Sequence, residues 1–176
     1  MKLILLALIS STLFAARLKD IAQLKGARDN QLVGYGLVIG LQGSGDKSVD
    51  LTANSMEMML KGMGLDPKNE KLQTKNVAAV IATATLPPFT KMGSKLDVSI
   101  ASIGSASSLE GGTLMMTSLR GPDGNIYAIA QGKALIQKKS SSGGGGGGNA
   151  AQNTVTALVP NGALLEKELH YDYTAT

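Results

Sequence analysis

The sequence predicts an α+β fold dominated by strands, with mixed sheets, one clear amphipathic helix and short accessory helices. Three observations predict it. Residues 77–86 are a continuous run of small and β-branched residues, typical of a strand buried on both faces. Residues 96–100 alternate apolar with polar side chains, as a half-exposed strand does. Four apolar residues recur at helical spacing from Met56 to Met63, which predicts a helix over about residues 52–63.

The first 16 residues have the layout of a secretory signal peptide. Lys2 precedes an apolar run at residues 3–9, and small residues follow, so we expect cleavage near Ala15 or Ala16. The apolar run is much shorter than the roughly 20 residues that span a bilayer. We therefore expect a mature chain that leaves the cytoplasm and has no transmembrane segment.

The composition limits how the core is built and which partners fit. The 176 residues include no cysteine and no tryptophan, so an exported domain must be stabilised by packing rather than by disulfides. The net charge of +4 is diffuse, without an arginine-rich stripe, so we expect no nucleic-acid partner. A basic surface can still meet an anionic polymer, and peptidoglycan is one.

Glycines and prolines mark further elements along the chain. The glycine-rich apolar run at residues 33–41 predicts a buried strand whose backbone another element approaches closely. Thr52 is predicted to cap the N-terminus of the helix, and Gly62 and Gly64 to end it. Pro87, followed by a second proline, ends the strand at residues 77–86.

Two later segments predict a hairpin and a returning strand. Residues 113–119 and 126–131 flank a turn that contains Asp123-Gly124, the pattern of a β-hairpin. Residues 154–159 resume a strand, which the Pro-Asn-Gly sequence at 160–162 is expected to end in a turn.

The predicted organisation has four parts. A signal peptide at residues 1–16 precedes an α+β core at residues 17–139. A Ser/Gly-rich stretch at residues 140–150 is expected to be a flexible loop, because it has almost nothing to bury. Residues 151–176 are expected to form a return strand and the start of a C-terminal portion.

The glycine-rich segment at residues 40–48 nearly matches a phosphate-binding loop. That motif needs lysine directly after its last glycine, because the lysine reaches the phosphate oxygens. Here Asp46 separates Gly45 from Lys47 and places a negative charge where phosphates would lie. The glycines at residues 34–40 likewise miss the dinucleotide-binding spacing by one residue. We predict no nucleotide site and no cofactor.

The sequence offers little for catalysis. His170 is the single histidine and there is no cysteine, so a zinc cluster is not expected, and nothing marks a nucleophile elbow. Asp97 and Glu110 could be imagined as paired carboxylates, but solvated charges are the simpler interpretation. We predict no catalytic residue, no metal ligand and no enzymatic activity.

Several blocks of the chain occur in an order typical of one exported family. They are Arg28-Asp29-Asn30-Gln31-Leu32-Val33-Gly34-Tyr35-Gly36-Leu37-Val38-Ile39-Gly40-Leu41, Lys75-Asn76-Val77-Ala78-Ala79-Val80, Leu86-Pro87-Pro88-Phe89, Lys95-Leu96-Asp97-Val98, Ser102-Ile103-Gly104, Ser108-Leu109-Glu110-Gly111-Gly112-Thr113-Leu114-Met115-Met116-Thr117, Tyr127-Ala128-Ile129-Ala130-Gln131-Gly132 and Pro160-Asn161-Gly162-Ala163. From about residue 18 to about residue 169, the chain resembles the flagellar basal-body P-ring protein family.

This resemblance implies a structural subunit of the bacterial flagellum basal body, located in the periplasm. Such subunits polymerise into a homo-oligomeric ring around the distal rod at the peptidoglycan layer, and the ring acts with the L ring as a bushing for rod rotation. The implied partners are further copies of the chain, the distal rod, the L-ring protein, a periplasmic P-ring assembly chaperone and peptidoglycan. On this interpretation, residues 17–139 are the ring-forming core.

The resemblance also suggests candidate contact residues. Lys75 lies in a shared block and is the first candidate for an electrostatic contact with the rod or a neighbouring subunit, and Lys91 and Lys95 come second. The family commonly has a lysine where Ser107 stands here. Its members continue past the block at residues 160–163, so we expect this chain to be an N-terminal portion, as a fragment or a truncated product.

Two other function classes remain open at this point. One is a periplasmic cell-wall-binding or adaptor module that forms no ring, and oligomerisation distinguishes it from a ring subunit. The other is an exported hydrolase, which would need a pocket around His170 or Asp97.

Overall fold

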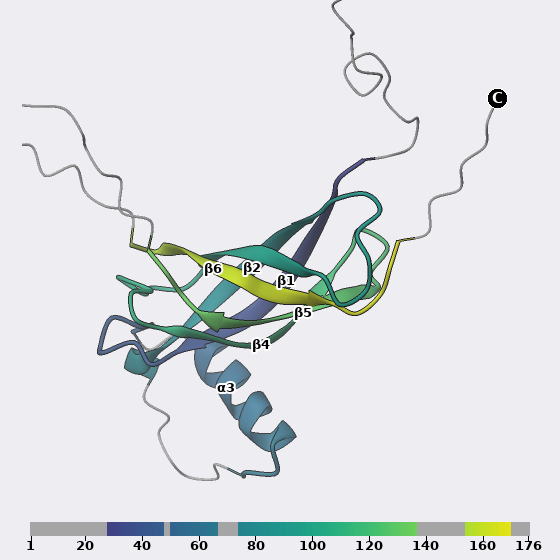
Figure 1. The fold of residues 1–176 in the computed structure, drawn as a ribbon. Coiled ribbons are helices and arrows are strands. Elements are labelled where there is room, and N and C mark those ends of the chain that lie inside the picture. The colour runs from purple at the N-terminus through teal and green to yellow at the C-terminus, as the bar shows by residue number, and fades with distance from the viewer. Residues whose placement is uncertain (1–27, 48–49, 67–73, 137–153, 170–176) are drawn as a thin grey trace, which may run out of the picture. The chain divides into compact units, whose positions relative to one another are not determined.

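The computed structural model describes residues 28–47, 50–66, 74–136 and 154–169. Six strands in the described residues form a closed barrel in the order β1-β2-β3-β6-β5-β4, and one helix packs outside it (Figure 1). The elements in chain order are β1 (Asn30–Ile39), α3 (Asp50–Gly62), the 3-10 helix η1 (Thr74–Asn76), β2 (Val77–Leu86), β3 (Lys95–Ser102), β4 (Thr113–Arg120), β5 (Ile126–Lys133) and β6 (Thr156–Leu165). The predicted α+β class, with strands dominant and one clear helix, is confirmed.

The strand pairing refines that prediction. All six pairings of the barrel are antiparallel rather than mixed. The β4–β5 hairpin closes around the predicted turn. The predicted signal peptide with Ala15 and Ala16, the loop at residues 140–150, and His170 all lie outside the described residues.

The core fills the interior of the barrel. Inward-facing residues of β2 and β3, such as Val80, Val98 and Ile100, are almost completely buried, as expected for a small barrel that side chains fill. On β2 the outward-facing Val77 and Ala79 are buried too, because α3 covers them. The predicted burial of this strand on both faces is therefore confirmed for its first half.

The glycines of β1 bring two strands unusually close. A Cβ atom at Gly34 would lie 2.5 Å from the Ser118 carbonyl oxygen and 2.8 Å from Leu119 Cδ2 on β4, so the predicted close approach is confirmed. The prediction that the whole run is buried is wrong. Val33 and Tyr35 are exposed, because the outer face of a closed barrel meets solvent and α3 covers only the far end of β1.

A buried carboxylate fastens α3 to the barrel. Thr52 lies inside the helix rather than capping it as predicted, and its hydroxyl donates a 2.6 Å hydrogen bond to Asp46 Oδ2. The same oxygen accepts from the Ala79 N–H of β2 at 2.8 Å. Both Asp46 and Thr52 are fully buried. One carboxylate oxygen thus joins the start of the helix to the sheet.

The predicted turn at residues 160–162 is also wrong. β6 continues through this sequence as a bulge: Leu96 pairs with Ala163 and Val98 with Val159, so three residues of β6 lie opposite Asp97. Asn161 has a φ of 51°, a conformation that asparagine tolerates better than most residues. Its N–H donates to Asp97 Oδ1 at 2.7 Å, which holds the bulge in place.

Replacing Gly34 with alanine tests the close approach of β1 to β4. Gly34→Ala should lower the free energy of unfolding by about 1–3 kcal/mol, because β4 backbone occupies the space of the new methyl group. Gly62→Ala is the matched control, since nothing lies within 4 Å of its Cβ position and alanine favours helix by up to about 1 kcal/mol. Urea denaturation of both variants measures the difference, and an equal stability of the two would contradict it.

Replacing Thr52 with valine tests the fastening of α3. Thr52→Val keeps the shape but removes a buried hydrogen bond to a carboxylate, so we expect a loss of about 1.5–3 kcal/mol in the free energy of unfolding. Thr156→Val, at an exposed position of β6, should change it by less than about 0.5 kcal/mol. Faster amide hydrogen exchange confined to α3 in the first variant would support the local role.

Candidate interaction surfaces

The three lysines singled out from the sequence do not form one patch. Lys75 lies in η1, directly before β2, whereas Lys91 and Lys95 lie in and after the loop that follows β2. All three are exposed. Ten residues of β2 separate the two positions, which corresponds to roughly 30 Å of extended chain. The structure therefore places Lys91 and Lys95 at one end of the barrel and Lys75 at the other.

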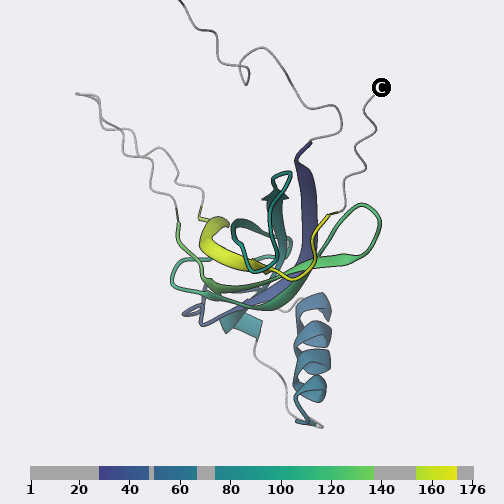
Figure 2. The same cartoon turned by 45° about the vertical axis from the view of Figure 1, so that its right-hand side comes forward.

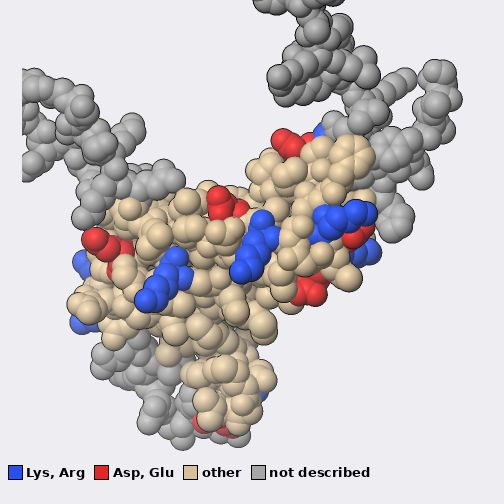
Figure 3. Space-filling view, viewed as in Figure 1, with Lys and Arg blue, Asp and Glu red and all other residues tan. Residues whose placement is uncertain are grey.

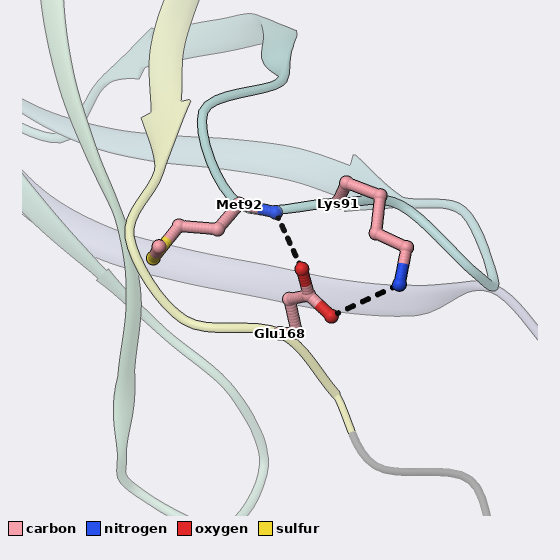
Figure 4. A network of polar contacts seen from close by, with 3 residues as sticks. All are labelled: Lys91, Met92 and Glu168. Atoms are coloured by element: carbon pink, nitrogen blue, oxygen red, sulfur yellow. Dashed lines mark hydrogen bonds and ion pairs between the residues drawn. The ribbon is translucent and has the colours of Figure 1, made fainter.

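Lys91 takes part in a small group of polar contacts where the chain leaves β6. Glu168 accepts from the Met92 N–H at 3.1 Å through one carboxylate oxygen, and its other oxygen lies 3.4 Å from Lys91 Nζ (Figure 4). The backbone of the same loop pairs with the end of β6, since Gly93 donates to the Leu165 carbonyl oxygen at 2.8 Å. The loop after β2 and the chain leaving β6 are thus fastened together. Sequence reasoning missed Glu168, which no local pattern marks.

Lys95 lines a polar groove on the outside of the barrel. The pairing of β2 with β3 stops at Thr83 and Ser99, while β3 stays paired with β6 as far as Lys95. The two strands diverge there and leave a groove of about 430 Å³. Its polar lining comes mainly from Gln31, Thr83, Thr85, Lys95, Asp97 and Asn161. Amides, hydroxyls and one charge of each sign suit hydrogen bonding to a polar chain.

Asp97 and Glu110 are not a pair of catalytic carboxylates in the structure. Asp97 fixes the β6 bulge from β3, whereas Glu110 is exposed in the turn before β4. Within the described ranges, no group of three or more histidine, cysteine or acidic side chains is placed to hold a metal ion. The helices described include none with the length and apolarity to cross a membrane.

The segment that resembles a phosphate-binding loop has a different use. Its Asp46 points inward to α3 and β2, as described above, and its carboxylate fills the space beside Gly104. The next N–H, of Lys47, donates to Ser105 Oγ at 2.8 Å. Asp46 Oδ2 and the Lys47 N–H are therefore engaged by the protein itself, and the spacing that argued against phosphate binding reflects a structural carboxylate.

The shifted pKa values arise from hydrogen bonds between side chains close together in the sequence. A 2.6 Å hydrogen bond to Glu57, one helical turn away, raises the pKa of Lys61. In the β4–β5 turn, hydrogen bonds from Asn125 and Tyr127 lower the pKa of Asp123, and the bond to Asp123 raises the pKa of Tyr127. These contacts stabilise a helix and a turn, and neither site faces the groove.

Charges are scattered over the face drawn in Figure 3. Figure 3 shows lysine and arginine side chains standing apart from one another among mostly uncharged residues. No single strongly basic patch is visible on that face. Contacts made by this face would therefore depend on shape and apolar area, with individual charges adding direction.

Comparison with known proteins finds a family profile and relatives that carry the same name. A sequence profile described as flagellar P-ring protein matches residues 17–176. A flagellar P-ring protein from Sinorhizobium medicae is 51% identical over 165 residues, which cover 93% of this chain and 44% of that protein. Proteins of the same name from Aquifex aeolicus and Vibrio cholerae are 49% and 47% identical over 168 residues, 95% of this chain and 46% of each relative.

The chain spans less than half the length of these curated relatives. The profile nevertheless matches all but the first 16 residues of the chain. The matched range includes every strand of the barrel, α3, and the three candidate lysines. The blocks singled out from the sequence, such as the glycine-rich β1 and the hairpin of β4 and β5, fall inside it as well. The chain belongs to the flagellar P-ring protein family.

Proposed function

We propose that this chain is a structural, non-enzymatic subunit of the flagellar P ring. The single observation that supports this most strongly is the identity of about one half to proteins named flagellar P-ring protein, over more than nine-tenths of the chain. In this proposal the chain polymerises around the distal rod in the periplasm, at the peptidoglycan layer. With the L ring it acts as a bushing in which the rod turns.

The fold suits a static ring around a moving part. In a closed barrel every strand has a neighbour on both sides, so the sheet has no edge strand to which another strand could add along its whole length. Its interior is packed with small and aliphatic side chains, and such packing resists deformation. A bearing surface needs stiffness and weak adhesion rather than a catalytic group.

The polar groove beside Lys95 supports a contact with the cell wall. Peptidoglycan consists of glycan and peptide, and both bind through hydroxyl and amide groups such as those of Gln31, Thr85 and Asn161 in this groove. The L-ring protein and a periplasmic assembly chaperone are further proposed partners, for which the family resemblance is the support. The predicted signal peptide, if cleaved near Ala15 or Ala16, would bring the chain to that compartment.

The alternative is a periplasmic cell-wall-binding or adaptor module that forms no ring. The same groove would serve it, so only assembly separates the two functions. Electron microscopy of purified hook–basal bodies decides between them. A strain that lacks the gene should lack the periplasmic ring, and restoring this chain should restore it. A normal ring in the deletion strain would overturn the proposal.

The lysines can be tested as two separate contacts because they lie at opposite ends of β2. We propose that Lys91 and Lys95 meet the rod or a neighbouring subunit at one end, and that Lys75 makes a different contact. Individual exposed charges contribute only about 0–1 kcal/mol, so the double variant Lys91→Gln/Lys95→Gln should slow swimming measurably more than either single variant. The readout is swimming speed at two salt concentrations.

Lys47→Gln is the matched control, since Lys47 is also exposed but lies in the loop before α3. It should leave swimming unchanged. Equal swimming of the double variant and the control would contradict an electrostatic role for Lys91 and Lys95. Lys75→Gln is then measured independently, and an effect of that variant alone would assign the contact to the end of the barrel near η1.

A further inference from the structure

One face of α3 is apolar and uncovered. Met56 and Met59 pack against the barrel, but Leu51 and Met58, seven residues apart on the opposite face, are 48% and 74% exposed. Just past the helix end, Met63 and Leu65 are also more than half exposed. We call these four residues the free face of α3. So many exposed large apolar residues on one short segment indicate an interaction surface.

The helix is held so that this face points outward. Figure 2 shows α3 extending from the barrel with its C-terminal end farthest away. The contacts that fix it lie toward its start, where Thr52 bonds to Asp46 at 2.6 Å and Ser55 bonds to the Tyr35 hydroxyl at 2.7 Å. A rigidly held apolar element needs little ordering when it binds, which lowers the entropic cost of association.

The opposite side of the barrel bears a complementary apolar strip. Ile129 of β5 lies directly opposite Leu164 of β6, which is 41% exposed. Farther along β6, Leu158 bridges to Leu135, which is 53% exposed. We call these four residues the β5–β6 strip. Ile129 and Leu158 are half-buried positions of β5 and β6, and Leu135 lies two residues past the end of β5.

The barrel order places the two surfaces on opposite sides. The helix α3 covers β1 and β2. In the closed order β1-β2-β3-β6-β5-β4, β1 lies three positions from β6, and β2 lies three positions from β5. One copy therefore cannot bring its own free face of α3 onto its own strip. Two different surfaces on opposite sides make a head-to-tail contact, the kind that closes into rings when the rotation between copies allows it.

The elements that carry the two surfaces differ in their charged residues. The segment 50–66 contains three acidic residues and one lysine. The strands β5 and β6 contain no acidic residue and one lysine, Lys133, and Lys95 of β3 pairs directly with Leu164. Acidic residues outnumber lysines near the helix face, whereas Lys95 and Lys133 stand near the strip together with Asp97 and Glu166. Pairing of the two lysines with the acidic residues of the helix segment would orient the partners.

We propose that the free face of α3 docks on the β5–β6 strip of a second copy of this chain, and that this contact joins neighbouring subunits. The proposal rests on the ring function proposed above and names the surfaces that would build it. Met58 is the central residue on the helix side, because it is the most exposed, and Leu164 is central on the strip, with Lys95 beside it.

Disulfide cross-linking tests this contact with no background, because the chain has no cysteine. The full chain bearing Met58→Cys and Leu164→Cys is expressed from its own locus in the flagellated host, and basal bodies are treated with a mild oxidant. We expect a ladder of dimers, trimers and larger species on non-reducing gels, and monomers only for either single variant. Swimming cells in the absence of oxidant establish that the double variant folds.

The matched control pairs Leu164→Cys with Met116→Cys, a methionine of β4 that is as exposed as Met58, at 74%, and belongs to neither surface. This pair should give no ladder. A dimer formed by Met58→Cys alone would mean that two helices pair with each other, and it would overturn the head-to-tail contact. A ring of this chain without a ladder would overturn the docking surface but leave the ring function standing. A ring that does not depend on this chain would overturn the proposed function instead.

Discussion

Closure of the barrel is the constraint on which the other features depend. For six short strands to close, neighbouring backbones must approach closely, and β1 allows this because Gly34 and Gly36 leave room for β4 side chains and backbone. Closure also gives both sides of each strand a neighbour, which satisfies backbone groups that an open sheet would leave at its edges. The glycines of β1 therefore serve close packing of β1 against β4 rather than ligand binding.

The outer surface features follow from how the barrel closes. β3 has to leave β2 to stay paired with β6, and the three residues of β6 opposite Asp97 absorb the difference in length as a bulge. The divergence of β2 and β3 creates the polar groove at Lys95. Beyond the groove, Glu168 fastens the loop after β2 to the end of β6. A candidate cell-wall contact and a candidate electrostatic contact thus lie at the same end of the barrel.

Local patterns in the sequence predicted the elements well, because apolar periodicity and turn residues are local signals. The strand at residues 77–86, the β4–β5 hairpin and the methionine-rich helix were predicted in this way and are confirmed. Barrel closure could not be predicted, because it depends on pairings between distant segments such as β3 and β6. The Pro-Asn-Gly sequence was misjudged for the same reason: it looks like a turn locally, but Asp97 on another strand stabilises it as a bulge. The spacing placed Met56, Met59 and Met63 on one face of the helix; Met56 and Met59 pack against the barrel, but Met63 lies past the helix end and is 56% exposed.

Asp46 connects the misleading motif in the sequence with the proposed assembly. A glycine-rich loop after a strand usually suggests an anion site, yet here the loop brings in its own carboxylate and buries it completely. One oxygen of that carboxylate satisfies Thr52 and Ala79, while the other has no hydrogen-bond partner within the described residues. A buried oxygen without a hydrogen bond lowers stability, and the two hydrogen bonds of the other oxygen, from Thr52 and Ala79, offset part of that loss while they fix the start of α3. A helix whose start is fixed and whose outer face stays apolar is poised to meet a neighbour. The aspartate that breaks the phosphate-loop spacing is therefore the residue that fixes the start of the proposed docking helix.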